Sequence, residues 1–356
     1  MSTSPRAVVS DATQARAPST GRLYYRRLGV EELPLLNDLH NAYYRRNRPL
    51  AEAAWLFAKN PHGSAVIYGA FSERGELIGI RPSIPFRLWW RGRERIAYEF
   101  ADALVHPRYQ RRGIFSGLLS SACDLAQQQH YLLFSLPNAY SLAAYRHNPN
   151  LQVLGSSCTV ARPLRWKDYA AQQLKLRPPM AEPAPAVEVP CDAALRDENV
   201  LLRPVERLDS DFSAVERELR ERGLSFALRS QAFLDWRYCG SPVRKYRLAR
   251  VEDHAAVRGY LVIRMMSGVA QIVDFFLQPD AALARSTFSL AAQWARQMGA
   301  CGIHFVSAGH PFFRNAARQA GYWLTRRSRR FVVDRAAARS ASLADLHFVM
   351  GDFDFM

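Results

Sequence analysis

The sequence predicts an α+β protein (α/β in looser terms) made of two tandem domains, each a mixed, mostly antiparallel sheet flanked by helices. The chain has 356 residues, which suits two domains of about 150 residues each. An Arg, a Trp and a Pro recur at identical spacings in the two halves, as Arg48, Trp55 and Pro61 and as Arg229, Trp236 and Pro242. Because such a repeat indicates two copies of one structural unit, each half is expected to follow the same order of elements.

The elements that follow this repeat agree between the halves. A strand–turn–strand pattern occupies 65–80 in the first half and 246–263 in the second, with apolar and polar residues alternating around the turn. A further strand ends in DALVHP (102–107) and in DFFLQP (274–279). Helices are expected from 115 and from 284, and apolar strands at 131–136 and 301–306. With an opening helical region in each copy, the plan is hairpin, strand, helix, strand, helix.

Composition sets the expected boundaries. Residues 1–21 are rich in Ser, Thr, Ala and Arg without the apolar core of a secretory signal, so a disordered lead-in is expected, with a transit peptide as the alternative. The first domain is placed at 22–165 and the second at 199–335. Between them, 166–198 contains RPPMAEPAPAVEVP, which predicts an extended linker. The tail, 336–356, is apolar and acidic, and its packing partner is left open.

The net charge of +16 favours anionic ligands over a nucleic-acid partner. All but four of the 48 basic residues are Arg, and they are spread along the chain rather than gathered in one tract. Codon bias explains such an excess as easily as function does. A positive field raises the on-rate of any anionic ligand, including cofactor phosphates and acidic glycans.

Cysteine usage and hydropathy indicate the compartment and the class of protein to expect. The five cysteines are scattered and never form a CxxC pair, which argues against a disulfide framework or a zinc site and for the cytoplasm. No histidine spacing fits a metal site, and none is expected. No apolar stretch approaches the roughly 18–20 residues that a membrane span needs.

The motif that indicates a chemical function is VHPRYQRRGIFSGLL, at 105–119. A strand ends near Pro107, a basic turn follows, and an amphipathic helix starts near Gly113. A turn at a helix N-terminus offers free backbone N–H groups and the positive end of the helix dipole, so it can bind phosphate. Gly113 allows close approach of the ligand, and Arg111 and Arg112 add positive charge. The alternative is a solvated basic turn in which the glycine merely closes a loop.

This stretch resembles the acyl-CoA-binding motif of the GNAT (GCN5-related N-acetyltransferase) superfamily, with Gln110 and Gly113 at the family positions. Phe115 departs from the usual Gly or Ala. The resemblance implies acetyl-CoA as the acyl donor, with its pyrophosphate held by the turn. The implied cofactor-binding residues are Leu104, Val105, Gln110, Arg111, Arg112, Gly113, Ile114, Phe115 and Asn138.

The second half lacks this turn. After Pro279 the chain reads DAALAR, with no glycine and with Asp280 where a cation would help. Because a phosphate would meet a negative charge there, the second domain is expected to bind no cofactor.

Two acidic residues precede the turn, Glu99 and Asp102. Asp102 is matched by Asp274 in the half without a phosphate turn, which indicates a structural role. Glu99 is matched by Gln271, and it lies where the histone-acetylating GNAT branch has its catalytic Glu. That resemblance implies a general base, with a solvated strand-edge glutamate as the alternative.

Downstream, PNAYSLAAY resembles a second GNAT motif, in which an Asn after a strand precedes a Tyr on the next helix. Asn138 and Tyr145 match that spacing, and the resemblance implies that Tyr145 is a general acid near the CoA sulfur. The usual Gly-Phe after the Tyr is missing, and a core tyrosine with a polar tip is the alternative. The second half has Ala317 at the Tyr position.

The resemblance implies an acetyl-CoA-dependent N-acyltransferase. By analogy with bacterial tandem GNAT proteins, the acceptor is expected to be an amine of a small metabolite or amino sugar, in a setting such as polysaccharide biosynthesis. Two alternatives stay open: an aminoacyl-tRNA-dependent (Fem-like) transferase, and a non-catalytic GNAT-like binding protein. The sequence leaves the acceptor, the acyl length and the oligomeric state open.

Overall fold

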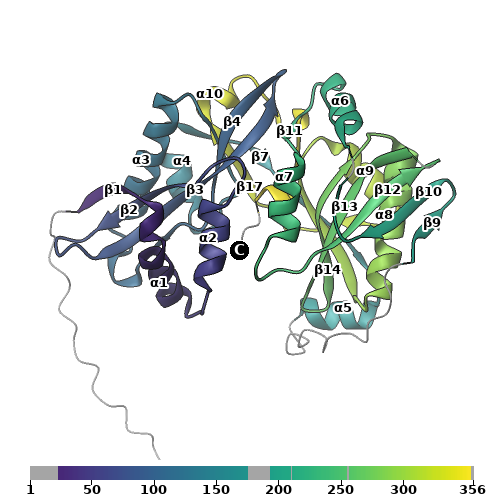
Figure 1. The fold of residues 1–356 in the computed structure, drawn as a ribbon, viewed down its shortest axis with the longest axis horizontal. Helices are drawn as coiled ribbons and strands as arrows, with labels where there is room; N and C mark the ends of the chain where they lie inside the picture. The colour runs from purple at the N-terminus through teal and green to yellow at the C-terminus, as the bar shows by residue number, and fades with distance from the viewer. Residues whose placement is uncertain (1–22, 175–192, 210, 255, 354–356) are drawn as a thin grey trace, which may run out of the picture.

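The structure is a computed structural model that describes residues 23–174, 193–209, 211–254 and 256–353. The expected lead-in, 1–21, and the Pro/Ala-rich stretch RPPMAEPAPAVEVP both lie outside these residues. Figure 1 shows two α+β halves side by side, each with helices packed against a sheet. The predicted fold class, two tandem domains of mixed sheet and flanking helices, is confirmed.

The first half follows the predicted order. Its elements are β1 (Tyr24–Leu28), α1 (Leu33–Tyr44), α2 (Leu50–Ala58), β2 (Val66–Phe71), β3 (Leu77–Trp90), β4 (Arg93–Phe100), β5 (Leu104–Val105), α3 (Ile114–Gln128), β6 (Leu132–Ser135), α4 (Leu142–His147), β7 (Leu151–Ser156) and β8 (Cys158–Pro163). A helix, α5 (Trp166–Gln173), begins the segment in which the sequence predicts a linker.

The second half repeats the plan. Its elements are β9 (Leu195–Asp197), β10 (Val200–Val205), α6 (Ser213–Glu221), β11 (Ser225–Ala227), α7 (Gln231–Leu234), β12 (Arg247–Asp253), β13 (Ala256–Met266), β14 (Val269–Leu277), α8 (Ala281–Gln297), β15 (Gly302–Gly309), α9 (Pro311–Gln319), β16 (Trp323–Leu324), β17 (Arg330–Asp334), α10 (Arg335–Ala338) and β18 (Leu346–Val349).

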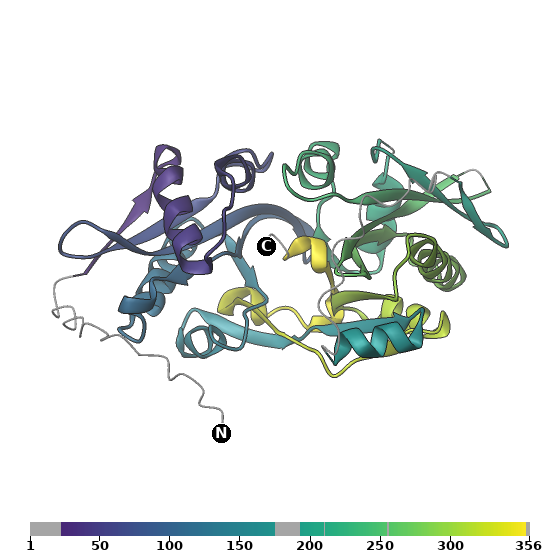
Figure 2. The ribbon, with the colours of Figure 1, turned by 90° about the horizontal axis from the view of Figure 1, so that it is seen from below.

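The two halves exchange a strand. In the first half, β6 and β7 both pair with β17, which belongs to the second half of the chain. In the second half, β15 and β16 both pair with β8, which belongs to the first half of the chain. Figure 2 shows these teal and yellow segments running between the halves. Because each half takes a strand from the other, the two halves depend on each other for a complete sheet.

The repeated tryptophans meet where the halves face each other. Trp55 Nε1 donates to the carbonyl of Trp236 at 2.8 Å, and Trp236 Nε1 donates to the carbonyl of Trp55 at 2.9 Å. The rings stack with centroids 5.2 Å apart. This reciprocal contact relates the two copies by approximate two-fold symmetry, so the repeated tryptophans hold the halves together.

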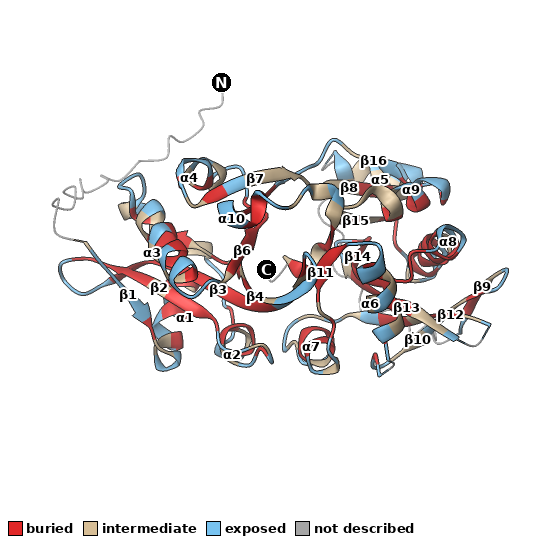
Figure 3. Cartoon of the chain, turned by 90° about the horizontal axis from the view of Figure 1, so that it is seen from above, coloured by how far each residue is buried: buried red, intermediate tan, exposed pale blue. Residues whose placement is uncertain are grey.

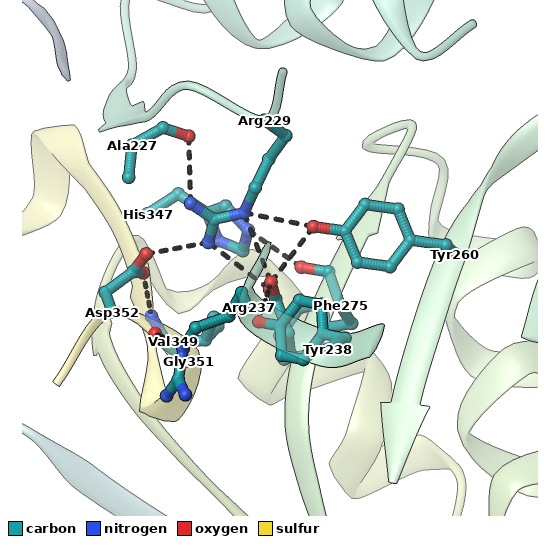
Figure 4. A network of polar contacts seen from close by, with 11 residues as sticks. Ala227, Arg229, Arg237, Tyr238, Tyr260, Phe275, His347, Val349, Gly351 and Asp352 are labelled. Atoms are coloured by element: carbon teal, nitrogen blue, oxygen red, sulfur yellow. Dashed lines mark hydrogen bonds and ion pairs between the residues drawn. The ribbon is translucent and has the colours of Figure 1, made fainter. Parts of the chain in front are cut away.

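The repeated Arg and Asp form a buried ion pair in each half. Arg48 Nη1 lies 2.6 Å from Asp102 Oδ2 in the first half. In the second, Arg229 Nε lies 3.2 Å from Asp274 Oδ2 and its Nη2 lies 2.8 Å from Asp352 Oδ1. Figure 4 shows this second network, which joins the C-terminal turn to the strands. The structural role inferred for the matched aspartates is therefore supported by their contacts.

The C-terminal segment closes the sheet between the halves. β18 lies parallel to β11 and antiparallel to β15, and β11 in turn pairs with β3 of the first half. The four residues of β18 are buried. Figure 3 places β11 between β4 of the first half and β14 of the second.

Buried histidines give the protein a defined acid sensitivity. Burial lowers the pKa of His62, His304 and His347 to about 4 each, from about 6.5 in an unfolded chain. Between these values the unfolded state binds more protons, so the free energy of unfolding is expected to fall as pH falls from about 6.5 to about 4. Asp352 acts with the opposite sign, since burial raises its pKa to about 6. With three histidines against one carboxyl, these groups together favour loss of stability toward acid.

Urea unfolding between pH 7 and pH 4.5 checks this expectation. His347→Gln, which removes one fully buried imidazole, is expected to show a shallower pH dependence than wild type. His254→Asn is the control, because the His254 side chain is 72% exposed. Equal slopes in all three proteins would contradict the assignment.

Candidate active site

The first half contains a strand pair that diverges. β4 and β6 run parallel through the pairs Ala97↔Leu132 and Glu99↔Phe134. Beyond this point β4 has ended, and the backbone turns at Asp102, whose φ is 49°. The next strand, β5, pairs with β3 through Ile80↔Leu104 and Gly79↔Val105. No strand pair joins β5 to β6 in the described part of the chain. One edge of β5 is thus available where the two strands separate.

The turn after β5 has the backbone that its glycine requires. Gly113 adopts φ 75°, in the left-handed region, and a Cβ built there meets no atom within 4 Å. The space around it is therefore open for a ligand. Arg111 also has a positive φ, of 62°. Gln110 reaches back to the strand, where its Nε2 donates to the Val105 carbonyl at 3.0 Å.

The N-terminus of α3 is uncapped. Its N-cap, Gly113, makes no side-chain cap, and its first turn contains no acidic residue. The first amides of a helix lack intrahelical acceptors, so those of Ile114, Phe115 and Ser116 are available to an anion. In the second half the matching helix α8 is capped, because Asp280 Oδ1 accepts from the Leu283 amide at 2.8 Å. Of these two helix N-termini, only that of α3 has free backbone N–H donors for an anion.

A buried polar cluster lies behind the turn, around Tyr145 of α4. The Tyr145 hydroxyl accepts a hydrogen bond from Arg81 Nη2 at 2.5 Å and lies 3.4 Å from Ser135 Oγ. Ser135 Oγ itself donates to the Phe100 carbonyl at 3.1 Å. Because the Tyr145 oxygen accepts from Arg81, its own proton can be directed to Ser135 or to a ligand.

Aromatic rings enclose the Arg81 guanidinium. Its carbon lies 4.3 Å from the Phe100 ring centroid, 5.0 Å from that of Tyr145 and 5.1 Å from that of Phe115. Arg81 is 1% exposed, and its Nε has no hydrogen-bond partner in the described part of the chain. Phe115, which departs from the GNAT pattern, thus forms one wall of this cluster. The ring faces stabilise the buried cation.

Electrostatics keep Tyr145 protonated. Burial raises the pKa of its hydroxyl, the charge of Glu99 acts in the same direction, and Arg81 opposes both. Glu99 is 3% exposed and lies on β4 next to Phe100. Since side chains alternate along a strand, Glu99 and Phe100 point to opposite faces of the sheet. Glu99 therefore acts on Tyr145 through its charge.

The other predicted residues surround this centre. Leu104 and Val105 are buried on β5, whereas Arg111 and Arg112 are exposed on the turn. Arg112 covers the Tyr109 ring at 5.6 Å. Asn138 orders the start of α4, where its Oδ1 accepts from the Ser141 amide at 2.9 Å. The roles predicted for all of these residues stay predictions.

Arg81 is the residue that the sequence analysis missed. A signal was present, because Arg81 interrupts the apolar run that begins at Leu77, in a strand buried on both faces. A charged residue in such a strand needs a partner. The partner, Tyr145, is distant in sequence and is identified only by the fold.

The diverging pair of β4 and β6 and the uncapped N-terminus of α3 together form an anion-accessible site in an α+β fold. Residues 24–147 match the family model for an acetyltransferase (GNAT) domain. The GNAT resemblance drawn from the sequence is thereby confirmed for the first half of the chain. A search of curated proteins gave no match.

Solved structures extend the likeness over most of the chain. A GCN5-related N-acetyltransferase from Anabaena variabilis is 14% identical with a TM-score of 0.60, and the match covers 88% of this chain and 72% of that one. N-myristoyltransferase from Saccharomyces cerevisiae, solved with myristoyl-CoA, is 12% identical with a TM-score of 0.56, at 90% and 82% coverage. A GCN5-related N-acetyltransferase from Kribbella flavida is 15% identical with a TM-score of 0.53, at 88% and 71% coverage. At these identities the likeness establishes the fold.

Two further findings bear on the class of site. Among the described residues, no group of three or more His, Cys, Asp or Glu side chains is placed to hold a metal ion. In the same residues, every helix is too short or too polar to cross a bilayer.

Proposed function

We propose that the chain is an N-acetyltransferase that binds acetyl-CoA in its first half. The uncapped N-terminus of α3 carries the proposal, since it offers free amides behind a turn with Arg111 and Arg112. The CoA pyrophosphate would bind there, and the pantetheine arm would lie along the available edge of β5. Asp280 at the start of α8 makes the second half unsuited to the same ligand.

The enclosed cluster favours a short acyl group. Arg81, Tyr145 and Phe115 fill the space beside the end of β4, where the thioester would lie. A long acyl chain would have to displace a buried cation and two rings. We therefore propose acetyl rather than a fatty acyl chain, with an amine of a small metabolite or amino sugar as acceptor and the cytoplasm as the location.

The proposed acetyl transfer needs one group that accepts a proton and one that donates a proton. The acceptor nitrogen attacks the thioester carbon, the C–S bond breaks, and the nitrogen loses a proton that Glu99 can accept directly or through water. Tyr145 can donate its proton to the departing thiolate, and Arg81 holds the Tyr145 oxygen so that this proton is free to be donated. The products are the acetylated amine and free CoA thiol, with protons balanced.

Release of CoA thiol over a panel of amines, including glucosamine and spermidine, tests this function. Tyr145→Phe and Glu99→Gln are each expected to lower kcat by about 10²–10⁴-fold, with little change in KM for acetyl-CoA. Tyr98→Phe is the matched control, a half-buried tyrosine on β4. If both active-site variants retained wild-type rates, a non-catalytic binding protein would be the better description.

A further inference from the structure

A cavity of about 640 Å³ opens in the first half, away from the proposed acetyl-CoA site. Its walls include the C-terminal end of α3, the starts of β4 and β6, and α10 with the two residues after it. The phosphate-binding turn lies at the other end of α3. Since that helix has 15 residues, the two places are separated by roughly 22 Å.

Arginines dominate the charged lining. Arg91, Arg93 and Arg95 come from the β3–β4 turn and from β4, and Arg335 and Arg339 come from α10 and its C-terminal end. We name this space the arginine cavity after these five residues. They come from two segments that lie far apart in the sequence and that the fold brings together.

Two of the arginines have no polar partner in the described part of the chain. Arg95 donates to the His130 carbonyl and Arg335 to the Pro149 carbonyl. Arg91 pairs with Asp345 at 3.4 Å, in an exposed ion pair of little energetic value. Arg93 and Arg339 make no side-chain hydrogen bond or ion pair to any other described residue. Their guanidinium groups are free to bind an anion, and such charge-assisted bonds are among the stronger ones in proteins.

The lining of the arginine cavity offers little negative charge to offset the positive charge of its arginines. Asp334 is its one carboxyl among the described residues, and that group accepts from the amides of Ala337 at 2.7 Å and Leu133 at 3.1 Å. Burial raises the pKa of Asp334. The Asp334 oxygens therefore accept from backbone amides, and in the described part of the chain Asp334 forms no ion pair with the five arginines.

The floor of the cavity is apolar. Cys123 and Ala126 of α3 and Leu132 and Leu133 of β6 are all less than 9% exposed. Trp90 is 4% exposed and adds an aromatic wall. A volume of this size, with an apolar floor and a few convergent polar groups, is typical of small-molecule sites.

We propose that the arginine cavity binds a small molecule that carries two or more phosphate or carboxylate groups beside an apolar portion. The site is separate from the turn at Gly113 and does not depend on acetyl-CoA binding there. Its ligand contacts β4 and α10 together, and α10 follows the strand that the second half contributes to the first half's sheet.

Calorimetric titration with inorganic pyrophosphate and with citrate tests the proposal and distinguishes phosphate from carboxylate ligands. Both titrations use Gly113→Glu protein, so that the turn cannot contribute. Binding is expected in that background, and Arg93→Ser/Arg339→Ser added to it should weaken binding at least tenfold. Neither guanidinium makes a polar contact with the described protein, so the variant should fold. Gln127→Trp, which fills the cavity mouth without changing its charge, should also weaken binding.

The control is Arg296→Ser/Arg318→Ser, which removes the same charge from exposed positions elsewhere. Absence of binding to Gly113→Glu protein, or equal weakening in cavity and control variants, would overturn the proposal. With Gly113 intact, the cavity variant should keep its stabilisation by acetyl-CoA. If the cavity bound the anions but acetyl-CoA failed to stabilise even the wild-type protein, that result would instead count against the proposed acetyltransferase function.

Discussion

Acetyl-CoA at 100 times its Kd is expected to raise the melting temperature of the wild-type protein and to leave that of Gly113→Glu unchanged. Such a ligand concentration stabilises the folded state by about 2.7 kcal/mol. Strand exchange makes the two halves one unfolding unit, and an unfolding entropy of about 2.1 cal/mol/K per residue then gives a rise of roughly 4 °C. In the variant, the introduced carboxylate would repel the pyrophosphate from the start of α3.

A glycine replacement at positive φ also costs stability by itself, roughly 1–2 kcal/mol. Gly299→Glu controls for that cost, because Gly299 has φ 81° in similarly open space. It is expected to lower the melting temperature without ligand and to retain the ligand-induced rise. A full rise in Gly113→Glu would remove the turn from the proposed site. No rise in any protein would favour the tRNA-dependent or binding-protein alternative.

The repeat and the glycine turn before α3 could be predicted from the sequence because both depend on local patterns. Arg48, Trp55 and Pro61 indicate the first copy by spacing alone, and a glycine between a strand and a helix indicates its own backbone conformation. The contacts that these residues make were not predictable. Nothing in the spacing says that Trp55 exchanges hydrogen bonds with Trp236 across the molecule.

Strand exchange shows the same limit on a larger scale. β8 pairs with β15 rather than with β6, and this choice depends on where the intervening segment crosses. The predicted domain boundary at residue 165 divides the chain by sequence position, whereas the strands pair with whichever strand lies beside them in space. Arg81 was missed for a related reason, because its partner Tyr145 is brought near it only by packing of α4 on the sheet.

Arg229→Met is expected to be the most destabilising single substitution considered for this chain. The Arg229 side chain is 1% exposed and contacts both Asp274 and Asp352, each with a fully buried side chain. Its Nε also donates to the Tyr260 hydroxyl at 3.0 Å. Methionine has a similar length but no charge, so two carboxyls would remain buried without their cation. Breaking a buried ion pair in this way costs about 3–5 kcal/mol.

Urea unfolding measures this cost, and two further variants identify its origin. Asp352→Asn added to Arg229→Met should recover part of the lost stability, because it removes one uncompensated carboxyl. Arg207→Met is the matched control: its ion pair with Asp235 lies at the surface, where such pairs contribute about 0–1 kcal/mol. A loss in Arg229→Met no larger than in Arg207→Met would mean that Asp274 and Asp352 are held neutral by their surroundings. The tyrosine hydroxyls of Figure 4 would then be the main support of the network.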